Sequence, residues 1–422
     1  MKCINEISKK VIIWVFTCTA IILFNLIDAE GKTIIVDKNS FYKNIKSALN
    51  ASKNSDTIII KQNNYSEGTL IIDKQLTLIG DNFPVLNGEG KNQIIIVKSS
   101  NVKISGIVFK NSGVSFLSDN SAIKLDSVSN CIIENNQFIN NFFAVYLSKS
   151  SHCKIINNQI KSNSTKQTMS GNGIHLWNCR DILIERNRIE GHRDGIYLEF
   201  VKHSRIIKNI SINNLRYGLH FMFSDSCSYK ENYFESNKSG VAVMFTKNVL
   251  MENNIFINNW GSASYGILLK EIYDSKILNN TFKKNSCGIY FEACNRIEVN
   301  KNNFIENGWA IKLMANSMDN IFKNNNFIEN TFDISTNSTH NYNSFKNNFW
   351  SKYDGYDLNK DNIGDVPYRP VKLFSFIVVN NPPALILLRS FFIDILDFAE
   401  KIIPTITPSD LIDSEPLMNK IL

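Results

Sequence analysis

The chain has 422 residues, with 46 Lys and Arg against 39 Asp and Glu, which gives a formal net charge of +7. The charges are spread thinly and form no basic cluster with interleaved aromatic residues, so the sequence does not indicate a nucleic-acid-binding protein. The eight cysteines include no Cys-x-x-Cys pair, which argues against a thiolate metal site or a redox motif.

Residues 1–29 predict an export signal. Lys9 and Lys10 precede an apolar run over residues 11–27, and polar residues end that run. The run is long for a signal peptide and its cleavage site is imperfect, so an uncleaved N-terminal anchor is the alternative. Both interpretations predict an exported protein.

Residues 33–51 predict an N-terminal helical cap. A short strand at residues 34–36 precedes an amphipathic helix with Ser40 as its candidate N-cap and with Ile45, Ala48 and Leu49 on one face. The open edge of a terminal coil would template aggregation, so we expect this helix to cover the first coil of the fold that follows.

A repeat with a period near 22 residues organises residues 30–352. An Asn, mostly in the motif Asn-x-Phe or Asn-x-Ile, recurs in steps of 22, 29, 22, 23, 22, 26, 22, 23 and 22 at Asn136, Asn158, Asn187, Asn209, Asn232, Asn254, Asn280, Asn302, Asn325 and Asn347. A Gly followed by apolar-x-apolar keeps the same rhythm at Gly173, Gly195, Gly218, Gly240, Gly266 and Gly288. Two independent markers with one period indicate a solenoid.

The residues between the markers decide which solenoid it is. Short runs of alternating apolar and polar residues are broken by Asn, Ser, Gly and Asp, and no stretch has the helical period. The motif of leucine-rich repeats is also absent. The sequence therefore predicts an all-β fold, a right-handed parallel β-helix with about 22 residues per coil, in which the recurring Asn side chains form a structural hydrogen-bonded ladder.

Three cysteines share one predicted inward column. Cys131, Cys153 and Cys227 each lie five residues before a ladder Asn. The first two fall on adjacent coils, where a separation of about 4.8 Å permits a disulfide in an oxidising compartment. Buried free thiols are the alternative that we favour, since free Cys is common in protein cores.

The Gly-led strands predict one outward face with a soft-metal or docking site. Alternation turns the second and fourth residues after each Gly outward, and the resulting set is His175, Trp177, Tyr197, Glu199, His220, Met222 and Met244. His220, Met222 and Met244 lie close enough to share a copper(I) ion, whereas His175 is two coils away and could serve only as a separate or relay ligand. The alternative is an apolar and aromatic patch that binds a partner through Trp177, Tyr197 and Glu199.

An enzyme is the competing class, because parallel β-helices are commonly polysaccharide lyases and hydrolases. Those enzymes need clustered carboxylates. On the outward columns Glu199 and Glu292 are four coils apart, about 19 Å, which is too far for glycoside cleavage. We therefore expect no catalytic residues.

Residues 353–422 predict a C-terminal loop and a helical docking segment. Asp357, Asn359, Asp361 and Asp365 occupy positions 1, 3, 5 and 9 of a calcium-type loop, but the Gly and the final Glu of such a loop are missing, so a solvated acidic turn is the alternative. After Asn381 and Pro382 the pattern predicts a helix over residues 385–403. Its apolar surface needs a partner, with the candidate contacts Leu385, Leu388, Phe392 and Ile395.

Several segments exceed what a generic β-helix repeat requires. They are residues 171–178 (GNGIHLWN), 191–200 (GHRDGIYLEF), 215–224 (LRYGLHFMFS), 240–244 (GVAVM), 353–357 (YDGYD), 365–370 (DVPYRP) and 381–384 (NPPA). In these segments the chain resembles the NosD family, the exported β-helix maturation proteins of nitrous oxide reductase. The resemblance runs from about Gly31 to the C-terminus.

The resemblance implies a periplasmic accessory protein, associated with the inner membrane, that helps to assemble the copper centres of nitrous oxide reductase. Its implied partners are an ABC-type ATPase and permease, a copper chaperone and the reductase. The implied cargo is copper, with sulfur supply for the copper-sulfide centre as the alternative. This chain has no Walker motif, so nucleotide hydrolysis would belong to a partner.

Overall fold

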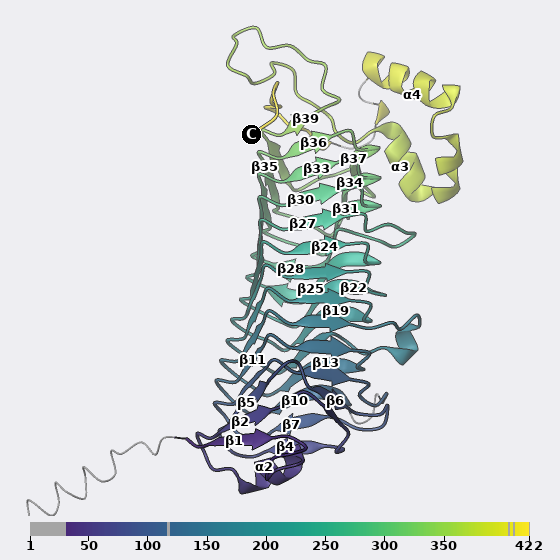
Figure 1. Ribbon diagram of the computed structural model, residues 1–422. Coiled ribbons are helices and arrows are strands. Elements are labelled where there is room, and N and C mark those ends of the chain that lie inside the picture. Colours follow the sequence, from purple (N-terminus) through teal and green to yellow (C-terminus); the bar gives the residue numbers. More distant parts are fainter. Residues whose placement is uncertain (1–30, 116–118, 404–405, 408–409, 422) are drawn as a thin grey trace, which may run out of the picture.

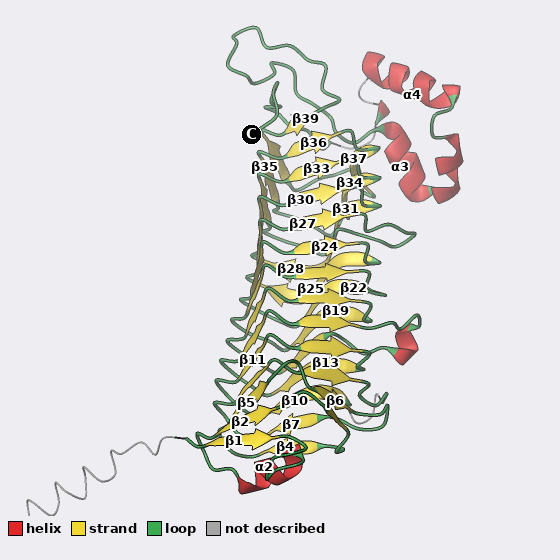
Figure 2. Cartoon of the chain, in the orientation of Figure 1, coloured by secondary structure: helices red, strands yellow, loops and turns green. Residues whose placement is uncertain are grey.

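The computed structural model describes residues 31–115, 119–403, 406–407 and 410–421 and shows one long stack of β coils (Figure 1). The predicted signal peptide or anchor lies outside the described residues. Three parallel sheets run the length of the stack, so each coil contributes one strand to each sheet (Figure 2). This confirms the predicted parallel β-helix. Tyr197 pairs with His220 and Met222 pairs with Met244, so one coil spans 23 or 22 residues there.

Sheets A and B form two of the three walls. The strands of sheet A are β1 (Thr33–Val36), β2 (Thr57–Ile60), β5 (Thr77–Gly80), β8 (Lys103–Ser105), β11 (Ile132–Glu134), β14 (Lys154–Ile156), β17 (Leu183–Glu185), β20 (Arg205–Ile207), β23 (Ser228–Lys230), β26 (Leu250–Glu252), β29 (Lys276–Leu278), β32 (Glu298–Asn300), β35 (Ile321–Lys323) and β38 (Ser344–Lys346). Those of sheet B are β3 (Asn64–Tyr65), β6 (Val85–Asn87), β9 (Val108–Lys110), β12 (Gln137–Ile139), β15 (Gln159–Lys161), β18 (Arg188–Glu190), β21 (Ile210–Ile212), β24 (Tyr233–Glu235), β27 (Ile255–Ile257), β30 (Thr281–Lys283), β33 (Asn303–Ile305), β36 (Asn326–Ile328) and β39 (Phe349–Trp350).

Sheet C is the wall built from the Gly-led strands, and it carries the longest strands of the solenoid. They are β4 (Leu70–Ile72), β7 (Ile95–Val97), β10 (Ser121–Asp126), β13 (Phe143–Ser148), β16 (Ile174–Trp177), β19 (Asp194–Glu199), β22 (Tyr217–Met222), β25 (Ser239–Lys247), β28 (Ile267–Tyr273), β31 (Cys287–Glu292), β34 (Trp309–Leu313) and β37 (Phe332–Thr336). A loop with the short helix η1 (Gln167–Met169) leaves the stack before β16. The recurring Gly allows neighbouring coils to approach closely: a Cβ atom on Gly240 would lie 2.6 Å from the carbonyl oxygen of Gly266.

The predicted asparagine ladder holds the corner between sheets A and B. The backbone N–H and the Nδ2 of Asn232 both donate to Oδ1 of Asn254 at 3.0 Å, and this pattern continues from coil to coil. The last predicted position is wrong: Asn348 accepts from Asn325, whereas Asn347 has a φ of +55°. The buried residue after this turn is Trp350, whose ring stacks on Phe327 at 4.1 Å. The ladder Asn lies two residues before such a buried residue, so it is Asn348.

A second asparagine ladder was not predicted. Asn259 donates through Nδ2 to Oδ1 of Asn285 at 2.9 Å. The same contact links Asn214 to Asn237, Asn285 to Asn307 and Asn307 to Asn330, whereas Asn237 donates its backbone N–H to Oδ1 of Asn259. Both ladders lie in the core, so each amide that they pair avoids the cost of an unsatisfied buried group.

The N-terminal helix α2 (Ile45–Ala51) lies at the first coils and buries Ile45, Ala48 and Leu49, as predicted (Figure 1). Its N-cap is Asn44, whose side chain accepts from the N–H of Ser47. The prediction of Ser40 as the N-cap is therefore wrong: its hydroxyl bonds to main-chain atoms of the preceding turn.

The C-terminal helical region differs from the predicted single helix over residues 385–403. It contains α3 (Leu373–Asn380), η2 (Pro382–Leu387) and α4 (Phe391–Ile402), and the chain is extended at Leu388 between the last two. Helix α3 was not predicted. It packs against the solenoid through Phe374, whose ring lies 6.0 Å from that of Phe332 on β37. The region projects from the side of the stack (Figure 2).

The final described segment closes the open end of the solenoid. Asp413 and Leu417 form bridges with β38 and β39 and continue the stack by part of a coil. The buried carboxylate of Asp413 accepts through Oδ2 from Asn348 Nδ2 at 3.0 Å and from Trp350 Nε1 at 3.0 Å. The first asparagine ladder therefore ends on an aspartate about 65 residues further along the chain.

Candidate functional site on sheet C

Sheet C presents the outward residues that the sequence predicted. Inward residues such as Ile196, Leu198, Leu219 and Phe221 are fully buried, which confirms the alternation. On the outer face the register pairs His175 with Tyr197 and Tyr197 with His220 in one column. The neighbouring column pairs Trp177 with Glu199, Glu199 with Met222 and Met222 with Met244.

Met222 and Met244 are direct partners on the adjacent strands β22 and β25, and both are half-buried. Adjacent strands are about 4.8 Å apart, so two thioethers at paired positions can reach one ion. Thioether sulfur is a soft ligand that suits copper(I). The structure thus brings together the two methionines that the sequence selected.

His220 belongs to the outer face but is only 5% exposed. The rings of Tyr197 and Tyr217 pack edge-on against it, with centroids at 4.9 Å and 4.8 Å. Its Nδ1 lies 3.4 Å from Oδ2 of Asp194, whereas its Nε2 is buried and has no hydrogen-bond partner. The expectation of an exposed ligand is therefore corrected: His220 has one free ring nitrogen, and neighbouring side chains cover it.

Strand alternation did not predict Asp194 and Arg216 as site residues, because they precede Gly195 and Gly218 instead of following them. Asp194 is 0% exposed and accepts from Arg216 through both carboxylate oxygens, with Nε at 2.8 Å from Oδ1. Burial alone would raise the pKa of the Asp194 carboxyl, but hydrogen bonds from Arg216 and His220 outweigh it and hold that pKa below its ordinary value. The carboxylate is therefore ionised beneath the face of the sheet.

His175 lies apart from this cluster. Its ring stacks on Tyr146 at 4.6 Å and contacts Tyr197 at 4.8 Å, and its Nδ1 lies 3.0 Å from Nδ2 of Asn172. Burial, and then the charge of Arg193, lower the pKa of His175 to about 3. Since Tyr197 separates it from His220, the structure does not join the two histidines in one site.

The predicted docking residues line the same face. Trp177 packs against a cluster of Phe142, Phe143 and Tyr146. The ammonium of Lys149 lies 5.4 Å from the centroid of the Trp177 ring. Tyr197 and Glu199 are half-exposed on β19. These side chains can form a contact surface, but each already has a neighbour within the chain.

Three phenylalanines that the sequence analysis missed follow this face at its edge. Phe200, Phe223 and Phe245, here called the phenylalanine ridge, stack with centroids at 5.3 Å and 5.0 Å. Each has a φ near +50°, where bulky residues are disfavoured, and the first two are 47% and 42% exposed. The ridge directly follows Glu199, Met222 and Met244 in sequence, so it borders the methionine pair.

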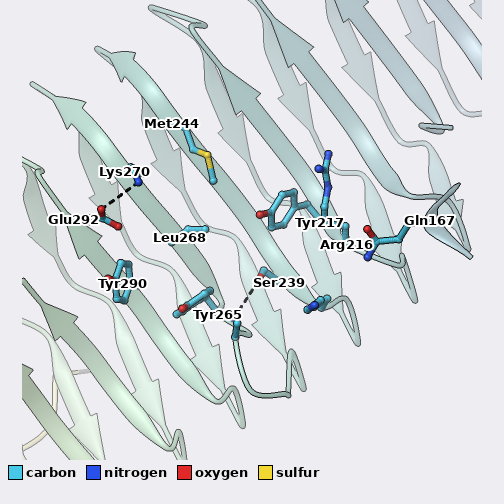
Figure 3. Close-up of a pocket in the computed structure, with 12 residues that line it drawn as sticks. Gln167, Arg216, Tyr217, Ser239, Met244, Tyr265, Leu268, Lys270, Tyr290 and Glu292 are labelled. Atoms are coloured by element: carbon cyan, nitrogen blue, oxygen red, sulfur yellow. Dashed lines mark hydrogen bonds and ion pairs between the residues drawn. The ribbon is translucent and has the colours of Figure 1, made fainter. Parts of the chain in front are cut away.

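A cleft of about 430 Å³ lies beside the site (Figure 3). Met244 and Leu268 lie on its floor and the rings of Tyr217, Tyr265 and Tyr290 line it. Lys270 and Glu292 pair within it at 3.2 Å, so neither charge stands alone. Glu292 is four strands from Glu199 in sheet C, as the spacing predicted, and the two carboxylates are not brought together.

The side-chain oxygens of the candidate calcium loop accept hydrogen bonds from the backbone of the same loop. Asp357 accepts from the N–H of Lys360 and Asn362, Asp361 from that of Ile363, and Asp365 from that of Leu358. Asn359 donates to Asp361 at 3.0 Å. Among all described residues, no group of three or more His, Cys, Asp or Glu side chains is placed to hold a metal ion. A site on sheet C therefore depends on the methionines.

The predicted contacts of the C-terminal region divide into two sets. Leu385 and Leu388 pack against the cluster that includes Phe332 and Phe374, so they stabilise the chain itself rather than present a free surface. Phe392 and Ile395 on α4 are 46% and 49% exposed. Other large apolar residues exposed with them are Ile386, Phe391, Phe398 and Ile402.

The six cysteines of the described residues are buried free thiols, as we favoured, including the adjacent pair Cys131 and Cys153. Burial raises the pKa of the Cys227 thiol to about 12, so it is protonated at neutral pH. Thiols in this state are poor metal ligands. Among the described helices, none has both the length and the apolar character needed to cross a bilayer.

Two solved structures share the fold. The exopolygalacturonase of family 28 from Yersinia enterocolitica has a TM-score of 0.58 and 11% identity, and the match covers 75% of this chain and 79% of that one. PfbA, a surface adhesin of Streptococcus pneumoniae, has a TM-score of 0.56 and 13% identity over 77% of this chain and 92% of that one. At these identities the similarity shows the fold alone.

Sequence comparisons give a more specific result. A family model described as "Periplasmic copper-binding protein (NosD)" matches residues 162–355, which include the site on sheet C. A protein of Pseudomonas aeruginosa named "Probable ABC transporter binding protein NosD" is 28% identical over 400 residues, which cover 83% of this chain and 86% of that protein. A protein of the same name from Stutzerimonas stutzeri is 28% identical over 153 residues, 35% of this chain and 30% of that protein. The chain is therefore similar to NosD proteins over most of its length, and its fold is a parallel β-helix.

Proposed function

We propose that this chain is a periplasmic accessory protein that helps to assemble the copper centres of nitrous oxide reductase. The description of the matching family as copper-binding and the name of the relatives as ABC transporter binding proteins support this proposal. In it, the chain binds copper(I) briefly and passes it on, working with an ABC-type ATPase and permease and with a copper chaperone.

The observation that carries the proposal is the arrangement of Met222, Met244 and His220. Two thioethers at paired positions and one imidazole with an unbonded Nε2 provide soft ligands without a fixed negative charge. These residues fit copper(I) as a cargo ion. His175 would serve only as a separate ligand, because Tyr197 lies between it and His220.

The side chains that cover His220 provide a physical basis for controlling the transfer of copper(I). Since Nε2 is buried, neighbouring side chains must shift before copper can reach it. Contact with a partner protein at Trp177, Tyr197, Glu199 and the phenylalanine ridge could supply that shift. The middle ring of the ridge is stacked on both faces, so it offers its edge to apolar side chains of a protein rather than a face to a sugar ring.

We propose a second contact at the C-terminal region, where the exposed apolar residues Phe392, Ile395 and Phe398 of α4 bind the permease. Asp394 and Asp397 lie on the same helix and would be repelled by anionic lipid headgroups. These charges favour a protein surface over the bilayer itself. Association with the inner membrane would then be indirect.

Replacing both methionines tests the copper site. We expect Met222→Ala combined with Met244→Ala to weaken copper(I) binding by about tenfold or more, since a loss of only ~1.4 kcal/mol in binding free energy costs a factor of ten. Thermal unfolding should change little, because both side chains face outward and leave no core cavity. Competition with a chromophoric copper(I) chelator measures the affinity.

The control is Met318→Ala, which removes a methionine that is 42% exposed elsewhere on the chain. It should leave the copper affinity unchanged. If the double variant retains wild-type affinity but loses binding to the copper chaperone, the face is a docking patch and the copper site is refuted.

A further inference from the structure

Asp194 is buried on the outer face of sheet C, where a carboxylate would ordinarily be exposed. Removing an ionised carboxylate from water is costly unless charged hydrogen-bond donors compensate for the loss of solvation. Arg216 supplies two such bonds, and the N–H of Tyr217 approaches Oδ1 at 3.4 Å. The remaining contact is with His220, at 3.4 Å between Nδ1 and Oδ2.

The two nitrogens of His220 have different surroundings. Nδ1 faces a carboxylate, which can only accept a hydrogen bond, so the proton of the neutral imidazole is favoured on Nδ1. Nε2 is buried and meets no donor or acceptor among the residues that the structure describes. In this tautomer Nε2 carries a lone pair. Histidines that bind metals usually donate their other N–H to a carboxylate or carbonyl in this manner, which fixes the ring and makes the ligand more basic.

We propose that Asp194 is a positioning residue that holds His220 in the tautomer whose Nε2 can bind a soft metal cation. Arg216 fixes the carboxylate by binding both oxygens, which leaves one lone pair of Oδ2 directed to His220. The inference rests on the proposed function for its copper consequence. The tautomer itself is a property of the metal-free protein.

The tautomer can be measured in the wild-type protein without copper, and a substitution is needed only to assign the signal. Long-range nitrogen–proton NMR spectra of the uniformly labelled protein distinguish the two neutral forms of each histidine, and a spectrum of His220→Gln assigns the signal. We expect the proton of His220 on Nδ1. A proton on Nε2 would overturn the inference even if Asp194→Asn failed to fold.

The effect on copper follows from Asp194→Asn. An amide in place of the carboxylate can donate to Nδ1, which moves the imidazole proton to Nε2 and blocks the metal-binding lone pair. We expect the proton to change position and copper(I) affinity to fall by about tenfold to a hundredfold, the usual cost of losing such a partner. Wild-type affinity in a variant whose tautomer has changed would contradict the inference.

The chain offers a control pair of the same geometry, with side chains that are 55% and 45% exposed whereas Asp194 is buried. Arg296 binds Asp274 with Nε at 2.6 Å from Oδ1 across the same step of 22 residues, and no histidine contacts that pair in the described structure. Asp274→Asn should therefore leave copper affinity and the His220 tautomer unchanged. If it lowers copper affinity as much as Asp194→Asn does, loss of an ion pair rather than positioning explains the effect.

The two proposals can fail separately. If Met222→Ala with Met244→Ala lowers copper affinity and Asp194→Asn does not, the copper site stands and the positioning role is refuted. If the double methionine variant binds copper normally while Asp194→Asn moves the proton of His220 and weakens binding, the positioning role stands and the methionines are not ligands.

Discussion

Replacing Asp413 with leucine should lower the free energy of unfolding by about 3–9 kcal/mol, because the side chain closes the end of the solenoid. Its Oδ2 accepts from the backbone N–H of Asn348, from Asn348 Nδ2 and from Trp350 Nε1, at 3.2, 3.0 and 3.0 Å. Leucine would leave three buried donors unsatisfied, at about 1–3 kcal/mol each. Denaturant unfolding measures the loss.

Asp413→Asn is the matched control, since it keeps one oxygen acceptor of the same size and at the same place. We expect it to lose less than half as much stability as Asp413→Leu. Equal stability of all three proteins would show that the terminal segment does not cap the β coils.

Because the terminal segment around Asp413 closes the solenoid, docking by the C-terminal helical region must not be tested by deleting that segment. A deletion of all residues after Asn381 would remove Asp413 and Leu417 together with α4, and it would expose the edges of β38 and β39. Lost partner binding would then reflect damage at the end of the solenoid. Substitution of Phe392, Ile395 and Phe398 by polar residues tests docking while the terminal segment around Asp413 stays in place.

Acidification should destabilise the protein through His192. This side chain is 0% exposed, neither ring nitrogen has a hydrogen-bond partner, and burial lowers its pKa to about 4 from 6.5. Between these values the unfolded state binds a proton that the folded state does not, so stability falls as the pH falls. The slope is about 1.4 kcal/mol per pH unit, so we expect a loss of about 2–3 kcal/mol between about pH 6.5 and 4.5.

His192→Asn should remove about 2–3 kcal/mol of the acid-induced loss of stability, and His175, whose pKa is lowered to about 3, contributes a further part that this variant retains. The backbone N–H of His192 donates to Oδ1 of Asn214, the first residue of the second asparagine ladder, so asparagine would extend that ladder. His203→Asn, at an exposed position, is the control and should retain the wild-type acid sensitivity. Unfolding curves at the two pH values measure this effect. If stability depends on pH in His192→Asn as it does in the wild type, the assignment of acid sensitivity to His192 is contradicted.

The coil repeat could be predicted from the sequence because the same chemical requirement recurs in every coil. Asn254 is needed to bond coil to coil, and Gly240 is needed because a Cβ would meet the next coil's carbonyl oxygen. The position of the last Asn could not be predicted, because residues 347 and 348 are both Asn and only packing decides which one points inward. Helix α3 was missed because residues 373–380 are apolar on nearly every side.

The candidate site could be predicted only in part. Strand alternation correctly placed Met222 and Met244 on one face and in register. It could not reveal that His220 is covered, since the cover comes from Asp194 and Tyr197 on the neighbouring coil and from Tyr217. Alternation assigns a residue to a face, whereas exposure depends on contacts across strands. The phenylalanine ridge was missed because its residues occupy turn positions where Asn or Ser is expected.

Copper K-edge X-ray absorption of the protein loaded with one equivalent of copper(I) tests the central claim most directly. If Met222, Met244 and His220 hold the ion, the spectrum should show sulfur and nitrogen in the first coordination shell. The sulfur contribution should disappear in Met222→Ala combined with Met244→Ala. A first shell of nitrogen and oxygen alone, or sulfur that persists in the double variant, would contradict the site.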